Sequence, residues 1–157
     1  MLRIPFVYER VTQVTESNSV ELSRRSRFLA AIVGAGLLAV LLLASQLRPD
    51  PRGWGTHEQL GLPPCTFLTV VGIRCPACGM TTAWASVTHG RFVDALRAHA
   101  SGTLLAGVAL AAAAWALIVA VRGKRLAWQP GETTIAGLAV ALTVLILCEW
   151  TFRLLAP

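Results

Sequence analysis

Charged side chains are scarce in this chain. Asp, Glu, Lys and Arg make up only 14% of its 157 residues, whereas soluble domains carry about 25%. Hydrophobic residues reach 55%, and the mean hydropathy is +0.61. A chain of this length is expected to form one domain, so residues 1–157 are taken as one unit. The charge deficit is too large for an ordinary globular surface, and the composition predicts an integral membrane protein.

A nucleic-acid-binding pattern is also lacking. The net charge is +6, and 13 of the 14 basic residues are Arg, but there is no basic stripe with interleaved aromatic residues of the kind that such surfaces use. The arginines lie near the ends of apolar runs, which suits contact with anionic headgroups and control of topology. We therefore expect the lipid bilayer, and not a nucleic acid, as the partner.

Three long apolar runs are present. They cover residues 28–47, 102–121 and 133–152, and the first is "FLAAIVGAGLLAVLLLASQL", without a single charge. At 1.5 Å per residue, 20 helical residues span about 30 Å, the thickness of the hydrocarbon core. The polar arm over residues 1–27 argues against a cleaved signal peptide. The sequence thus predicts an all-α membrane protein with three transmembrane helices.

The distribution of basic residues favours one orientation. Arg24, Arg25 and Arg27 precede the first run, and "RGKR" at residues 122–125 follows the second. Both segments fall on the same side of a three-helix protein, and short basic segments face the cytoplasm. Each side carries six basic residues, so the number alone shows no bias. The bias comes only from their density, because the residues on the other side are spread over a long loop. We expect the N-terminus inside, in a multi-pass protein of the bacterial inner membrane.

The segment over residues 48–101 is predicted to form a cap of short helices on the membrane surface. "TTAWASVTH" is expected to be a helix, capped by Thr81 or Thr82 and closed by Gly90. "RFVDALRAHA" predicts a second short helix, in which Asp94 and Arg97 are spaced for an ion pair. "CTFLTVVGI" is compatible with a short strand or with an interfacial segment. Fifty residues with so little charge are too few to bury a core alone.

The stretch "PPCTFLTVVGIRCPACGMTTAWASVTHGRFVDALRAH" resembles an uncharacterised family of small bacterial integral membrane proteins. The family pattern combines C-P-F, G-x-x-C-P-x-C-G-[ML]-T-R-A, a short helix and a turn into a transmembrane helix. Two departures stand out: Thr82 where the family usually has Arg, and His99 near the usual Asn. The resemblance supports the fold and carries no activity. Matching positions are Cys65, Gly72, Cys75, Pro76, Cys78, Gly79, Met80, Thr81, Ala83, Gly90, Ala95 and Leu96.

The cysteines are the candidate redox or metal residues. Cys75 and Cys78 form one C-x-x-C pair, and Cys65 lies ten residues before it. Zinc needs four N or S ligands, so Cys65 supplies a third and one of Cys148, His57, His89 or His99 a fourth. The second C-x-x-C of a zinc ribbon is missing. The three histidines are otherwise expected on the surface of the cap.

Two disulfide-based alternatives stay open beside zinc. In an oxidising compartment the cysteines commonly pair, with Cys75–Cys78 as the first candidate, and this structural reading is preferred. A membrane thiol–disulfide oxidoreductase is the alternative, since a C-P-x-C at a helix start favours the thiolate. That chemistry would need Cys65 and Cys148 as a second pair, and the βαβ pattern of thioredoxin-like proteins is absent.

No residue is assigned a catalytic role at this stage. Glu149 lies in the third apolar run, one helical turn before Arg153, and an interfacial ion pair accounts for it better than a functional site does. The preferred interpretation is a binding, structural or accessory membrane module and not an enzyme. Its metal is undetermined, with zinc as the candidate cofactor. Another membrane protein or a second copy of the chain is an open alternative as partner.

Overall fold

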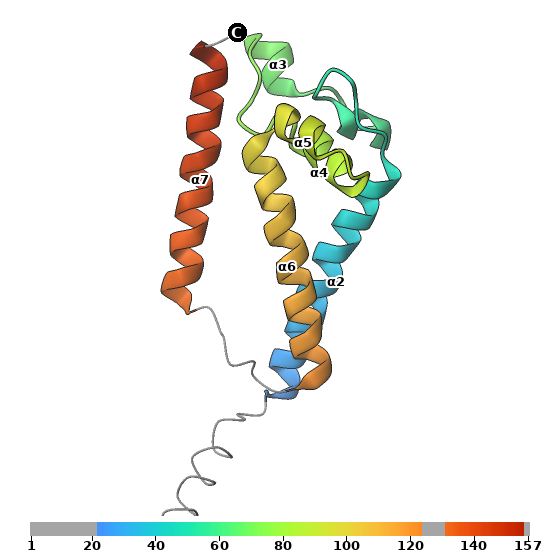
Figure 1. Ribbon diagram of the computed structural model, residues 1–157, viewed down its shortest axis with the longest axis vertical. Helices are drawn as coiled ribbons and strands as arrows, with labels where there is room; N and C mark the ends of the chain where they lie inside the picture. Colours follow the sequence, from blue (N-terminus) through green and yellow to red (C-terminus); the bar gives the residue numbers. More distant parts are fainter. Residues whose placement is uncertain (1–21, 124–130, 156–157) are drawn as a thin grey trace, which may run out of the picture.

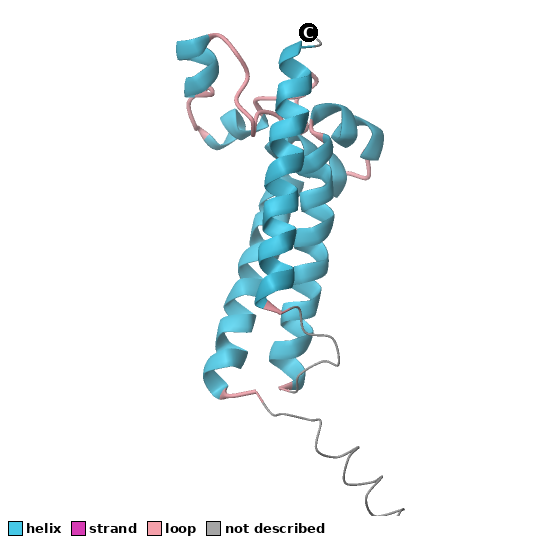
Figure 2. Cartoon of the chain, turned by 90° about the vertical axis from the view of Figure 1, so that its left-hand side faces the viewer, coloured by secondary structure: helices cyan, strands magenta, loops and turns pink. Residues whose placement is uncertain are grey.

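The computed structural model describes residues 22–123 and 131–155, which contain helices and no strand (Figure 1, Figure 2). Three helices are long and apolar enough to cross a membrane: α2 (Arg24–Gln46), α6 (Ala100–Arg122) and α7 (Glu132–Leu155). The all-α, three-span prediction is confirmed. Most of the predicted arm over residues 1–27 lies outside the described residues, as do Lys124 and Arg125.

Helices α2 and α6 form a close antiparallel pair (Figure 1). A Cβ added to Gly34 of α2 would lie 2.8 Å from Cγ of Leu117 on α6, so the glycine permits the close approach of the two helices. Small residues at helix interfaces let helices pack tightly in lipid, where no hydrophobic effect drives association. The buried residues of α6 are small apart from one valine: Ser101, Gly102, Ala106, Ala109, Ala113, Ala116 and Val119.

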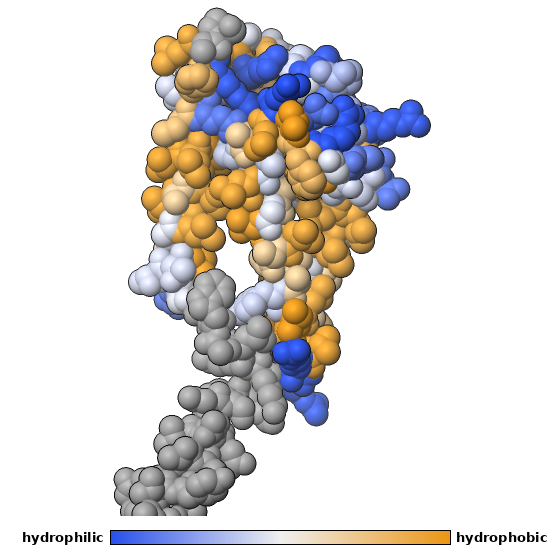
Figure 3. All heavy atoms as spheres, in the orientation of Figure 1, coloured by the Kyte–Doolittle hydropathy of each residue, from blue (hydrophilic) through white to orange (hydrophobic). Residues whose placement is uncertain are grey.

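Helix α7 is attached mainly at its C-terminal end. None of its described residues is buried, and the space-filling view shows an opening between α7 and the other long helices (Figure 3). Near the C-terminal end, the indole Nε1 of Trp150 donates to the carbonyl of Arg74 at 2.7 Å, and Arg153 donates to the carbonyls of Cys78 and Ala98. Polar contacts with the cap therefore hold α7 in place.

The cap lies between α2 and α6 in sequence and at one end of the long helices (Figure 1). It contains η1 (Thr56–Leu60), α3 (Thr66–Val71), α4 (Met80–Thr88) and α5 (Phe92–Ala98). Its small core contains Ala83, Ala95 and Ala98, with Val87 packed against them. Hydrophilic residues gather over the cap, and hydrophobic residues cover the long helices below it (Figure 3). The predicted cap of short helices is confirmed.

Three local expectations differ from the structure. The segment after Cys65 is helix α3, so the strand alternative is wrong; Gly72, at φ +77°, ends this helix. The N-cap of α4 is Gly79 and not a threonine, because the turn through the C-x-x-C pair leads directly into the helix. Asp94 pairs with Arg91 at 2.8 Å and not with Arg97. Gly90, at φ +72°, follows α4 as expected.

Candidate functional site

Two consecutive turns shape the C-P-A-C segment. The N–H of Cys78 donates to the carbonyl of Cys75 at 3.0 Å, and the N–H of Met80 donates to the carbonyl of Ala77 at 3.1 Å. Proline at the second position of the first turn restricts φ and suits this geometry. Gly79 then adopts φ +99°, a conformation that side chains disfavour. These local preferences hold the two cysteines close together at the start of α4.

Helix α3 brings a third thiol to this pair. Cys65 is the N-cap residue of α3, and the sulfur atoms of Cys65, Cys75 and Cys78 all lie within 4.8 Å of one another. Cys78 is buried, whereas the other two are half-buried. None of the four cysteines is bonded to another cysteine, and the Cys75–Cys78 disulfide stays a prediction. Cys148 is exposed on α7 and does not belong to the three-thiol cluster.

The three thiols differ in acidity. The backbone N–H of Leu68 lowers the pKa of the Cys65 thiol by stabilising its thiolate. Burial raises the pKa of Cys75, and burial together with the neighbouring thiols raises the pKa of Cys78 to about 11. A buried charge is costly unless an opposite charge accompanies it. The cluster can therefore hold three thiolates only when a cation lies among them.

A cavity of about 170 Å³ adjoins the cluster and is lined by all three cysteines together with His57. His57 is half-buried and is the one histidine among the described residues that lines this cavity. His89 instead makes a 2.7 Å contact between its Nδ1 and the carbonyl of Ala85 within its own helix. Among the residues named from the sequence as a fourth ligand, His57 is the one that lines this cavity, but it does not belong to the group whose ligand atoms lie within 4.8 Å of one another.

His99 is buried, with 1% of its surface exposed, so its predicted surface position is wrong. It is the N-cap residue of α6, and its Nδ1 accepts the N–H of Gly102 at 3.0 Å. Its Nε2 lies 2.9 Å from the carbonyl of Pro76, which can only accept. These two partners assign the neutral tautomer with the proton on Nε2. The ring thus connects α6 to the cysteine turn.

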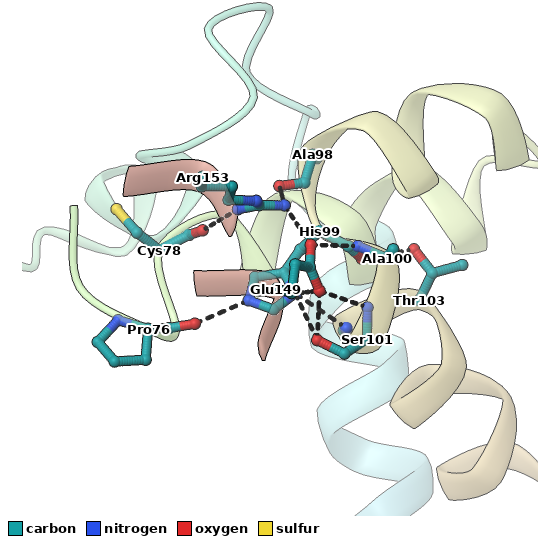
Figure 4. A network of polar contacts seen from close by, with 10 residues as sticks. Pro76, Cys78, Ala98, His99, Ala100, Ser101, Thr103, Glu149 and Arg153 are labelled. Atoms are coloured by element: carbon teal, nitrogen blue, oxygen red, sulfur yellow. Dashed lines mark hydrogen bonds and ion pairs between the residues drawn. The ribbon is translucent and has the colours of Figure 1, made fainter. Parts of the chain in front are cut away.

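Glu149 completes this polar network (Figure 4). Its carboxylate accepts the backbone N–H groups of Ala100 and Ser101, both at 2.8 Å, and also the hydroxyl of Ser101. Its predicted ion pair with Arg153 is present. Because the His99 Nδ1 already accepts a hydrogen bond, its 3.2 Å approach to Glu149 is a contact with a neutral ring and not an ion pair.

The sequence predicts only one of the two roles of Glu149. The i,i+4 spacing to Arg153 predicts the ion pair, but nothing in the sequence indicates that the carboxylate also satisfies the free N–H groups at the start of α6. For His99 a weak signal exists, since it directly precedes the small residues that open α6.

The comparisons with known proteins add a family of unknown function. The model of a family described as "Protein of unknown function (DUF2752)" matches residues 65–117, about a third of the chain. The match begins at Cys65, covers the whole three-thiol cluster, and ends within α6, so it does not include α7. No curated protein and no solved structure matches the chain.

Proposed function

We propose that the chain is a small metal-binding membrane module in which the thiolates of Cys65, Cys75 and Cys78 bind one zinc ion. The mutual proximity of three sulfur atoms, within 4.8 Å, is the observation that carries this proposal. Two sulfurs bound to tetrahedral zinc at about 2.3 Å lie about 3.8 Å apart. The cluster needs to contract by only about an ångström to reach that geometry.

We assign the fourth ligand position to His57, whose ring has to move towards the thiols because it lies outside the 4.8 Å group. It lines the same cavity as the three cysteines and comes from η1, a different element of the cap. A Cys₃His set is among the usual structural zinc sites. Three thiolates and a neutral imidazole around Zn²⁺ leave a net charge of about −1. Zinc would then tie η1, α3 and the start of α4 together, which a cap with so small a core needs.

The acidity of the thiols favours metal over disulfide exchange. Exchange requires an accessible thiolate, whereas Cys78 is buried with a pKa raised to about 11, and the pKa of Cys75 is raised too. A membrane thiol–disulfide oxidoreductase therefore ranks second. It remains the competing function because Cys75 and Cys78 stand close enough for pairing after a small movement.

The proposal also includes the location and orientation of the chain in a membrane. The chain would form one membrane domain in the inner membrane of a bacterium, with the N-terminus in the cytoplasm and the cap on the opposite face. Helix α7 has no buried residue among those described, which leaves room for a membrane-protein partner or a second copy. In this setting the zinc site has a structural or binding role and no catalytic one.

Metal analysis with thiol counting tests the proposal. Wild-type protein purified in detergent without chelator should contain one zinc and four thiols per chain, and Cys65→Ser, Cys75→Ser and Cys78→Ser should each lose most of the metal. Cys148→Ser is the matched control, since that cysteine lies outside the cluster, and it should keep the zinc. Metal-free protein with a Cys75–Cys78 disulfide would refute the zinc site and favour the oxidoreductase.

A further inference from the structure

A second, larger cavity lies between the C-terminal end of α7 and the cap. It has a volume of about 540 Å³ and is lined by four arginines, whereas Glu149 is the one carboxylate among the described residues that line it. The arginines come from the loop after α2, the turn before the first C-x-x-C cysteine, α5 and α7: Arg52, Arg74, Arg97 and Arg153. The charged side chains that line the cavity therefore carry a net positive charge.

Two of these arginines have no carboxylate partner among the residues that the structure describes. Arg153 pairs with Glu149, and Arg52 pairs with Asp50 and Glu58 outside the cavity lining. Within the described ranges, Arg74 and Arg97 form no ion pair.

The position of Arg74 is stabilised without being neutralised. Its guanidinium lies 5.6 Å from the ring centroid of Trp54, a cation–π contact that leaves its N–H groups available. Arg97 is exposed on α5. Asp94, which is spaced to pair with it, forms its ion pair with Arg91 instead. Two guanidinium groups are thus available at one cavity, each able to bind a phosphate by two parallel N–H···O bonds.

Apolar side chains also line the same cavity. Ile73, Trp150 and Leu154 line it beside the arginines, and Ile73 and Leu154 are 37% and 40% exposed. The cavity lies between the C-terminal end of α7 and the cap, and hydrophobic residues cover the long helices below the hydrophilic cap (Figure 3). Below it, apolar side chains of α7 such as Val144 and Leu147 are exposed. A ligand that fits this site is anionic at one end and apolar at the other.

We propose that this cavity binds an anionic phospholipid, with the headgroup phosphate on Arg74 and Arg97 and an acyl chain along the exposed face of α7. Basic pockets at the ends of transmembrane helices bind anionic headgroups. A free phosphate shares the same chemistry, but it would leave the apolar lining from Ile73, Trp150 and Leu154 without a ligand. The bound lipid then fills the space between α7 and the other long helices and stabilises their arrangement. The cavity adjoins the proposed zinc site, because Cys75 also lines it, but the lipid is bound by the arginines and does not require zinc.

Lipid-dependent thermal stability of the detergent-purified full chain tests the site. Phosphatidylglycerol should raise the midpoint of unfolding at lower concentrations than phosphatidylcholine with identical acyl chains, and inorganic phosphate should have little effect. The double variant Arg74→Gln/Arg97→Gln should weaken the phosphatidylglycerol effect by about thirtyfold in concentration, as two arginine–lipid contacts imply.

Arg24→Gln/Arg25→Gln is the charge-matched control. It removes two positive charges at the start of α2, at the end of the molecule opposite the cap (Figure 1), and should keep the phosphatidylglycerol response. Equal stabilisation of the wild-type protein by phosphatidylglycerol and phosphatidylcholine would by itself overturn the proposal, whatever the variants show. An equal response to phosphate would overturn the lipid as the source of the anion. An equal loss in both double variants would reduce the effect to non-specific charge.

Discussion

Ser101 and Glu149 are 48 residues apart in the chain and are joined by two hydrogen bonds to one carboxylate oxygen, from the Ser101 backbone N–H at 2.8 Å and from its hydroxyl. The first residues of a helix have N–H groups with no partner in their own helix, and a negative charge there is favourable. The contact therefore fastens α7 to the start of α6, at the level where α7 also meets the cap.

Glu149→Gln should weaken the attachment of α7. The amide keeps one acceptor oxygen but presents an NH₂ group to a donor and loses the charge that pairs with Arg153. Charge-assisted hydrogen bonds contribute about 1.5–3 kcal/mol, so the free energy of unfolding should fall by an amount in that range. Chemical or thermal unfolding in detergent measures this. Glu132→Gln, at the exposed start of α7, removes the same charge and should change stability little; equal losses would contradict the assigned role.

Gly79→Ala should disrupt the cap and with it metal binding. A Cβ there would lie 2.5 Å from the carbonyl oxygen of Ala98 and 2.9 Å from that of Gly53, in a backbone conformation with φ +99°. Gly72→Ala separates backbone strain from steric clash. Gly72 has φ +77°, but no described atom lies within 4 Å of an added Cβ. The Gly72 variant should lose about 1–2 kcal/mol from backbone strain alone, and the Gly79 variant clearly more. Unfolding curves and zinc content compare them, and equal effects would argue against the packing role of Gly79.

Alkylation of metal-free protein should distinguish the three thiols. The pKa of Cys65 is lowered, chiefly by the Leu68 N–H, whereas burial raises the pKa of Cys75 and of Cys78. Since the thiolate is the nucleophile, Cys65 should react first and the buried Cys78 last. Time-resolved iodoacetamide labelling followed by peptide mass spectrometry gives the order. Added zinc should protect all three together; protection of only one or two would speak against a common metal.

The stability of the metal-free protein should fall at alkaline pH. Burial raises the folded-state pKa of Cys78 to about 11, above its ordinary value near 8.5–9. The folded state therefore holds this proton more tightly than the unfolded state, so the contribution is complete below the ordinary value and is lost as pH rises towards 11. Thermal unfolding in chelator between pH 8 and 11 measures it. Cys78→Ser lacks the titrating thiol and should show a shallower decline; parallel curves would assign the decline to other groups.

The helical architecture was predictable because a bilayer limits the choices. Unpaired backbone groups are costly in lipid, so an apolar run of about 20 residues is helical there. The predicted runs over residues 28–47, 102–121 and 133–152 fall inside α2, α6 and α7 except for Leu47, which is the C-cap residue of α2. Helix α6 starts two residues earlier than predicted because His99 caps it and Glu149 binds its first N–H groups.

The sequence by itself determined the local features of the site. Cys75 and Cys78 are close because they are three positions apart in a turn that contains Pro76. Only the tertiary structure decided that Cys65 joins them, that Cys148 does not, and that His99 is buried. These outcomes depend on how short helices of the cap pack and on where α7 lies against α6. Several such arrangements satisfy the same hydrophobic pattern, and polar contacts between residues distant in sequence, such as that of Glu149 with Ser101, select one of them.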